Sequence, residues 1–157
     1  MDNSIRLYPF SPEHSRAVLE IRPEPPALYR LHYNAYWIGQ SVLHRDIYSV
    51  LIADGSGSIR GFAAWGRCYI DEYLMFPAEG GVAELYHLVI DPRFQRRGIG
   101  AAAVRQICRD ADGEGYRQIR VAHHPDDPDV AGFYHNLGFA PLGENFDGDP
   151  WLNKDLQ

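Results

Sequence analysis

Alternation of apolar and polar positions marks the strands of this chain, and more continuous apolar runs mark its buried ones. Ser4–Tyr8 alternates, and apolar runs follow at 48–53, 59–69 and 82–90. The turn at 54–58, which reads Asp-Gly-Ser-Gly-Ser, joins two of these runs into a predicted hairpin. Three later segments complete a predicted set of strands, at 118–123, 139–143 and 150–156.

Capping and helix-forming residues predict the helices between these strands. Ser11 followed by Pro12 is typical of a helix start, and we expect that helix to run to about Ile21, before a group of prolines. A less regular helix is expected within 27–46, and clearer ones at 98–111 and 129–137. The resulting order predicts a mixed α/β fold in a single domain, residues 1–157.

Composition narrows the class of protein. The 157 residues are 45% hydrophobic and 23% charged, as in an ordinary globular domain. No apolar run reaches the length of a membrane span, and the first residues lack the pattern of a signal peptide. Cys68 and Cys108 fit no disulfide framework. We therefore expect a cytoplasmic protein without a membrane partner.

Charge is unevenly distributed along the chain. Residues 93–109 hold five arginines and no acidic residue, whereas the net charge of the whole chain is −6, so the other 140 residues carry −11. This balance disfavours a general nucleic-acid surface. It fits one polyanionic ligand at the basic segment and a cationic ligand elsewhere, and a solvated basic helix face explains the arginines equally well.

The glycine turn Gly98-Ile99-Gly100 follows a strand and a basic loop and opens a predicted helix. Free backbone N–H groups at a helix start bind anions, and glycine allows close approach. A dinucleotide loop would need an acidic residue at the end of 118–123, which has none, and a P-loop would need Gly-Lys-Ser/Thr. A purely structural turn and an acyl-coenzyme A site remain as the alternatives.

Two motifs in the right order favour the second alternative. Gln95-Arg96-Arg97-Gly98-Ile99-Gly100 is similar to the Gln/Arg-x-x-Gly-x-Gly/Ala signature of the GNAT superfamily of N-acetyltransferases. Residues 127–139 resemble that family's second cofactor element, Asn-x-x-Ala-x-x-Phe-Tyr-x-x-Leu-Gly-Phe. The resemblance, which covers 82–139, implies a central mixed, mostly antiparallel sheet of about seven strands flanked by about four helices. It also implies acetyl-CoA as co-substrate.

The resemblance assigns roles to individual positions. It implies that pyrophosphate is held by backbone N–H groups of Arg96, Arg97, Gly98, Gly100 and Ala101, flanked by the side chains of Gln95 and Arg96. It implies that the pantetheine arm pairs with Leu88, Val89 and Ile90. In the second element, Asp127 and Phe133 fall on cofactor-binding positions, although Asp127 stands where asparagine is usual and Val130 where alanine is usual. Tyr134 matches the general acid.

The general base is less clearly marked. Glu84 is the one carboxylate in the strand 82–90, where burial would raise its pKa toward neutrality, and a strand-end salt bridge explains it equally well. His87, on the opposite face of that strand, is a second candidate. His123 and His124 are adjacent and lack a third spaced ligand, so we expect no metal.

The acceptor is suggested by a weaker resemblance to bacterial spermine/spermidine, or diamine, acetyltransferases. It rests on 61–66, on the acidic pair Asp71 and Glu72, and on 144–148, whereas the acidic residue of that family's central strand falls on Tyr86. We expect a small-molecule amine, best a polyamine bound by Asp71, Glu72, Glu79 and Glu84. Other small amines, aminoglycosides, a protein N-terminus or a non-catalytic acyl-CoA-binding role stay open, and the sequence does not decide whether a homodimer forms.

Overall fold

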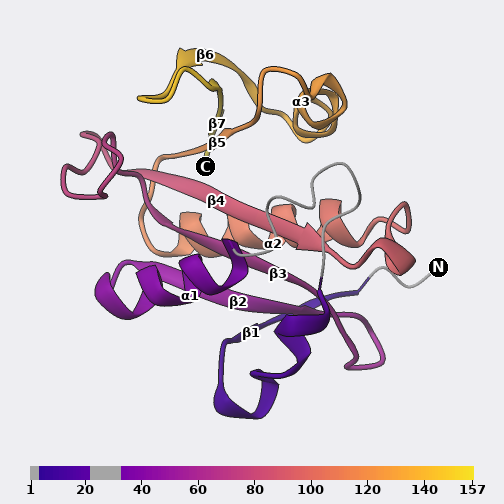
Figure 1. Cartoon of the computed structure of the whole chain (residues 1–157). Coiled ribbons are helices and arrows are strands. Elements are labelled where there is room, and N and C mark those ends of the chain that lie inside the picture. Colours follow the sequence, from indigo (N-terminus) through magenta and orange to yellow (C-terminus); the bar gives the residue numbers. More distant parts are fainter. Residues whose placement is uncertain (1–3, 22–32) are drawn as a thin grey trace. The chain divides into compact units, whose positions relative to one another are not determined.

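The computed structural model describes residues 4–21 and 33–157, which contain one mixed sheet of seven strands (Figure 1). Its strand order is β1-β2-β3-β4-β5-β7-β6. β4 pairs with β5 in parallel, and β1–β2, β5–β7 and β6–β7 are antiparallel. The predicted mixed α/β fold with its seven strands is confirmed. The bounds are β1 Arg6–Pro9, β2 Ile47–Ala53, β3 Ile59–Arg67, β4 Val82–Ile90, β5 Gln118–Ala122, β6 Ala140–Glu144 and β7 Pro150–Asp155.

Three α-helices lie within the described residues. They are α1 Tyr33–Leu43, α2 Ile99–Gly113 and α3 Pro128–His135, and short 3₁₀ helices occur at η1 Pro12–His14, η2 Ala17–Glu20 and η4 Pro92–Phe94. The helix expected within 27–46 is therefore found from Tyr33 onward, and the part at 27–32 lies outside the described residues. Within the described ranges, no helix is both long and apolar enough to cross a membrane.

The helix predicted from Ser11 to Ile21 is wrong, because this segment forms the two 3₁₀ helices η1 and η2. The Ser11 hydroxyl pairs with Nδ1 of His14 at 2.9 Å and caps no backbone N–H group. Val18 and Ile21 are both buried, and a spacing of three residues is that of a 3₁₀ turn. Burial of this pair in the core therefore accompanies the tighter helix.

The chain divides into two compact units, Met1–Trp65 with His87–Gln106 and Gly66–Tyr86 with Ile107–Gln157. In the first unit, α1 lies against β2 (Figure 1), and Leu51, Phe62 and Val89 share a core with Val18 and Ile21. In the second unit, β5 pairs with β7, and the buried residues include Ile119, Val121, Tyr134, Phe139 and Leu152.

β6 ends the strand order of the sheet. All five of its residues are exposed, and its pairing with β7 is interrupted by an irregularity between Pro141 and Gly143. The last strand of the sheet is therefore short and broken in register.

Candidate active site

The loop after β4, in the first unit, begins with a buried carboxylate that is fully engaged. Asp91 accepts hydrogen bonds from the backbone N–H of Arg93 at 3.0 Å and from its guanidinium at 2.7 and 3.0 Å. The Arg93 guanidinium holds the pKa of Asp91 below its usual range. One of the five arginines in the basic segment is therefore neutralised by Asp91.

Gln95 uses its side chain to close the end of β4. Its Nε2 donates to the carbonyl oxygen of Ile90 at 2.9 Å, so one of the predicted pantetheine-pairing groups already has a hydrogen bond. Leu88 and Ile90 are half-buried, whereas Val89 is buried in the core.

The backbone between Gln95 and α2 takes an unusual course. Arg96 has a φ of +62° and Gly98 a φ of +81°, and Arg96, Arg97 and Gly98 are exposed. Gly100 and Ala101 follow in the first turn of α2 and are half-buried. Left-handed residues just before a helix start turn backbone N–H groups toward one side and form anion-binding concavities. The predicted pyrophosphate residues therefore lie in one short segment that runs from an exposed loop into the first turn of α2.

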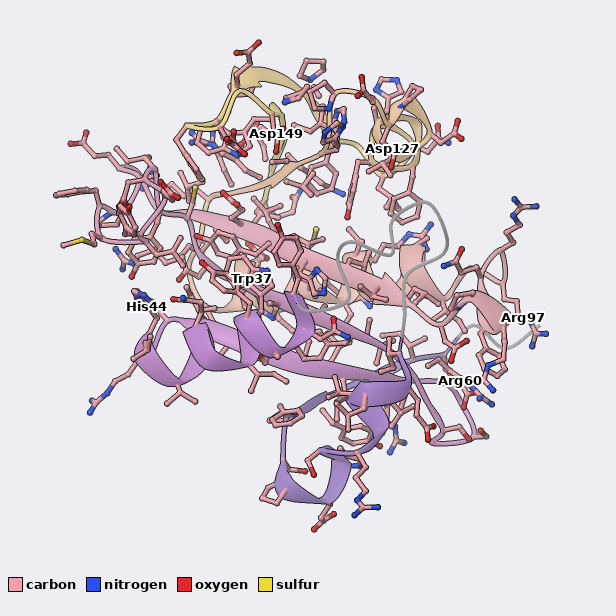
Figure 2. All side chains as sticks on the ribbon, viewed as in Figure 1. Trp37, His44, Arg60, Arg97, Asp127 and Asp149 are labelled. Carbon is pink, nitrogen blue, oxygen red and sulfur yellow. The ribbon has the colours of Figure 1, made fainter. Side chains whose placement is uncertain are left out.

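The ring of Phe94 gathers three guanidinium groups in the first unit. Arg60 lies 3.6 Å from the ring centroid, Arg97 5.3 Å and Arg93 5.5 Å. Figure 2 shows Arg60 and Arg97 at the same end of this unit. Arg60 also pairs with Asp54 at 2.8 Å. Sequence reasoning missed Arg60, because it stands outside the basic segment and no local motif connects it with the loop.

Glu84 lies on β4 in the second unit and is almost fully buried. The Cys68 Sγ–H donates to its Oε1 at 3.3 Å. Burial raises the pKa of Glu84 to about 8. Three neighbours act in the opposite direction and lower this pKa: the hydrogen bond from Cys68, the charge of Arg120 and the N–H of Trp151. Burial and the neighbouring Glu84 also raise the pKa of the Cys68 thiol, which stays protonated. Sequence reasoning missed Cys68, Arg120 and Trp151, whose proximity depends on strand register.

Tyr86, two residues along β4, fixes the chain on either side of Cys68. Its hydroxyl donates to the carbonyl oxygen of Arg67 at 2.6 Å and accepts the N–H of Tyr69 at 2.9 Å. Burial and the nearby Glu84 raise the pKa of this phenol. Tyr86 therefore serves as a donor and acceptor to backbone at this place.

The second predicted cofactor element forms α3. Asp127 stands at the start of this helix (Figure 2). It caps the helix, because its Oδ1 accepts the N–H of Val130 at 3.4 Å. Tyr134 is buried, and its ring meets those of Phe133 and Phe139 edge-on with centroids 4.9 and 5.4 Å apart. The predicted general acid is therefore held by aromatic neighbours in the same unit as Glu84.

The two predicted substrate carboxylates have different surroundings. Asp71 accepts the backbone N–H groups of Tyr73, Met75 and Phe76, the last at 2.8 Å. Partial desolvation tends to raise the pKa of Asp71, but the hydrogen bonds together outweigh it, so the pKa lies below its usual value. Glu72 is exposed beside it. Asp71 therefore organises its loop, while Glu72 is open to solvent.

His87, the second candidate base, belongs to a buried pair in the first unit. Its Nε2 lies 2.6 Å from Oδ1 of Asn34, and Nδ2 of Asn34 donates to the carbonyl oxygen of Ile21 at 3.0 Å. The second bond fixes the orientation of the carboxamide, so Nε2 of His87 carries the proton. Across residues 4–21 and 33–157, no three His, Cys, Asp or Glu side chains are grouped to hold a metal ion.

Comparison with known proteins agrees with these features. The model of the acetyltransferase (GNAT) family matches residues 11–139. The chain belongs to this family. The GNAT-family relatives include an uncharacterized N-acetyltransferase of Methanocaldococcus jannaschii, 27% identical over 67% of this chain and 45% of that protein. The chain spans between 28% and 45% of the length of the curated relatives it matches.

Solved structures show the same GNAT fold. The PaiA N-acetyltransferase of Thermoplasma acidophilum, in complex with coenzyme A, has a TM-score of 0.71 at 16% identity, covering 97% of this chain and 99% of that one. A chimera of the spermidine N-acetyltransferase SpeG of Vibrio cholerae has a TM-score of 0.72 at 11% identity, covering 96% and 95%. At these identities the likeness establishes the fold alone.

Proposed function

We propose that this GNAT-family chain transfers an acetyl group from acetyl-CoA to a primary amine, with a polyamine or diamine as the acceptor. The observation that carries the proposal is Glu84, a buried carboxyl group with a pKa near 8 on the strand whose exit forms the anion-binding loop. A general base works best when its pKa lies close to the operating pH. Membership of the GNAT family supports acetyl-CoA as the acetyl donor. The negative charge outside the basic segment supports a polycationic amine as the acceptor.

The loop before α2 suits the phosphates of acetyl-CoA. Arg96 and Arg97 are exposed, and neither has a carboxylate partner among the described residues. Together with the left-handed backbone at Arg96 and Gly98, they offer charge and N–H donors to a pyrophosphate. Arg96, Arg97, Gly98, Gly100 and Ala101 would hold the pyrophosphate, with the arm along Leu88 and Val89.

Two residues of the second unit would move the protons. An alkylammonium cannot attack a thioester, so Glu84 in its ionised form accepts the ammonium proton and frees the nitrogen lone pair. The amine nitrogen then attacks the acetyl carbonyl and forms the C–N bond, and its second proton passes to water. As the C–S bond breaks, Tyr134 donates its phenol proton to the departing thiolate. Bulk water restores both groups to their starting states.

Negative charge favours a polycationic acceptor. The 140 residues outside the basic segment carry −11, and Glu72 and Glu79 are exposed in the loop before β4, where Asp71 holds the backbone. Exposed carboxylates raise the local concentration of a flexible polycation and pair with it. Such attraction is screened by salt.

The test is thiol release from acetyl-CoA with a panel of acceptors: spermidine, a diamine, a monoamine and an N-terminal peptide. We expect turnover with the polyamine, and a Tyr134→Phe variant with kcat lowered about 10²–10⁴-fold at nearly unchanged acetyl-CoA affinity. Acetyl-CoA binding without turnover on any amine would instead indicate a non-catalytic acyl-CoA-binding protein.

The acceptor class is tested separately with salt and surface charge. Glu72→Gln combined with Glu79→Gln should raise the acceptor KM several-fold without lowering kcat, because only ground-state attraction is lost. Glu13→Gln combined with Asp112→Asn, which also removes two exposed charges, serves as the control. An acceptor KM that ignores both salt and the Glu72/Glu79 pair rules out the polyamine.

A further inference from the structure

Unpaired buried polar atoms gather on two neighbouring strands of the second unit. Within residues 4–21 and 33–157, three buried side-chain nitrogen or oxygen atoms lack a hydrogen-bond partner: Nε of Arg120, Nε1 of Trp151 and Oδ1 of Asn153. Arg120 belongs to β5, and Trp151 and Asn153 belong to β7. Buried polar atoms without hydrogen-bond partners are uncommon in native proteins. A cluster of three such atoms in one part of the fold therefore needs a physical explanation.

Strand register places these residues beside Glu84. Glu84 stands opposite Arg120 in the parallel β4–β5 pair, and Arg120 stands opposite Asn153 in the antiparallel β5–β7 pair. Trp151 is two residues from Asn153 and therefore lies on the same face. The Arg120 guanidinium is 4.8 Å from the Trp151 ring, and Cys68 reaches Glu84 at 3.3 Å.

The donors around Glu84 outnumber the hydrogen bonds that it makes. Among the described residues, the Cys68 Sγ–H is the one group that bonds to its carboxyl group within hydrogen-bond distance. Arg120 and Trp151 are near enough to lower its pKa, yet Nε of Arg120 and Nε1 of Trp151 have no hydrogen-bond partner. A protonated carboxyl keeps one oxygen as a donor, whereas a carboxylate offers acceptor positions on both oxygens. The unpaired N–H groups therefore match the ionised state of Glu84 better than its neutral state.

We propose that Cys68, Arg120 and Trp151 are positioning residues for Glu84. The Cys68 thiol holds the carboxyl group by a hydrogen bond, and Nε–H of Arg120 and Nε1–H of Trp151 donate to the carboxylate when it forms. The catalytic meaning of this arrangement rests on the proposed function, in which Glu84 is the base. In the cycle Glu84 gains one proton from the ammonium and returns it to water, and no covalent bond to Cys68 forms.

Other ionisable groups near Glu84 do not duplicate this role. Tyr86 and Tyr69 flank the site, and the Tyr86 hydroxyl is bonded to backbone on both sides of Cys68. Arg120 is the charged group that faces Glu84 from β5, and β7 contributes the neutral Trp151 and Asn153. Because its pKa is raised, the Cys68 thiol acts as a donor and not as a second anion.

The experiment titrates the Glu84 carboxyl group directly by ¹³C NMR in the full chain, with Glu84→Gln identifying its signal. Cys68→Ala and Trp151→Phe should each raise the midpoint by about one pH unit, because each removes a donor that favours the charged form. Cys68→Ser should restore the midpoint through its hydroxyl. Cys108→Ala removes the other buried cysteine and should leave it unchanged.

The rising limb of kcat/KM with pH should move by the same amount in each variant. Unchanged midpoints in both Cys68→Ala and Trp151→Phe, or an equal shift in Cys108→Ala, would overturn the proposal. If Cys68→Ala does not fold, Trp151→Phe and Cys68→Ser decide the matter. The titration needs no turnover. A protein that shows the expected midpoint shifts but acetylates no amine would therefore contradict the proposed function and leave the positioning role established.

Discussion

Arg96 holds a backbone conformation that residues with a Cβ seldom adopt. Its φ of +62° lies in the left-handed region, which costs a non-glycine residue about 1–2 kcal/mol. The strained residue stands in the loop that we propose binds acetyl-CoA, and backbone strain is often retained at ligand-binding sites. The sequence could not reveal this strain, because arginine at a loop position carries no sign of a positive φ.

Replacing Arg96 by glycine should therefore stabilise the free protein. Arg96→Gly is expected to raise the free energy of unfolding by up to about 1 kcal/mol, since removal of the Cβ relieves more strain than the added chain entropy costs. Chemical denaturation measures the change, with Arg97→Gly as the matched control that should lose stability. Equal losses in both variants would show that Arg96 is unstrained. Acetyl-CoA should bind Arg96→Gly more weakly, because the variant lacks one positive charge of the proposed phosphate-binding loop.

At the scale of elements, local patterns located most of the fold. β4 was predicted with its observed bounds, Val82–Ile90, and α2 was located within two residues at each end. The prediction for Ser11 to Ile21 failed because the expected cap is not made: the Ser11 side chain bonds to His14 and caps no backbone N–H group, and the segment forms two 3₁₀ helices. Tyr134 and most of the candidate cofactor residues came from two local motifs, whereas Glu84 came from its place in the strand 82–90. The neighbours of Glu84 could not be predicted, since they depend on the register of strands distant in sequence.

The cap of α3 offers a prediction at this scale. Asparagine caps a helix as well as aspartate does, and its amide could donate the N–H to pantetheine that the family pattern implies. Asp127→Asn should therefore leave the melting temperature unchanged while lowering the Kd for acetyl-CoA about two- to tenfold. Asp127→Ala should lose about 1 kcal/mol of stability. Calorimetric binding and thermal unfolding test both, and an Asn variant that binds acetyl-CoA no better shows that Asp127 acts only as a cap.

For the whole molecule, burial of Glu84 links stability to pH. Its pKa is raised from an ordinary value near 4.5 to about 8, so the folded protein holds a proton that the unfolded chain releases. The corresponding stability is fully present below about pH 4.5 and is lost as the pH rises through 8. Asp54, Asp71 and Asp91 have lowered pKa values and act in the opposite sense, losing their contribution in acid. Stability should therefore be greatest at mildly acidic pH.

Glu84→Gln isolates the contribution of this one group. Relative to the glutamine variant, the native chain should lose stability between about pH 5 and pH 8, by at most about 1.4 kcal/mol per pH unit, and the difference should level off above pH 8. Denaturant titrations across pH 5 to 9 measure both curves. Parallel curves throughout this range would mean that Glu84 titrates normally in the folded protein.

The broken register of β6 has a consequence for how copies of the chain meet one another. A strand at the end of a sheet presents unpaired backbone groups that can recruit a strand from another molecule and seed a growing ribbon. Pro141 lacks an N–H group, and the irregularity beside Gly143 twists the ladder out of line. The β6 edge is therefore a poor template for pairing with a strand of another molecule.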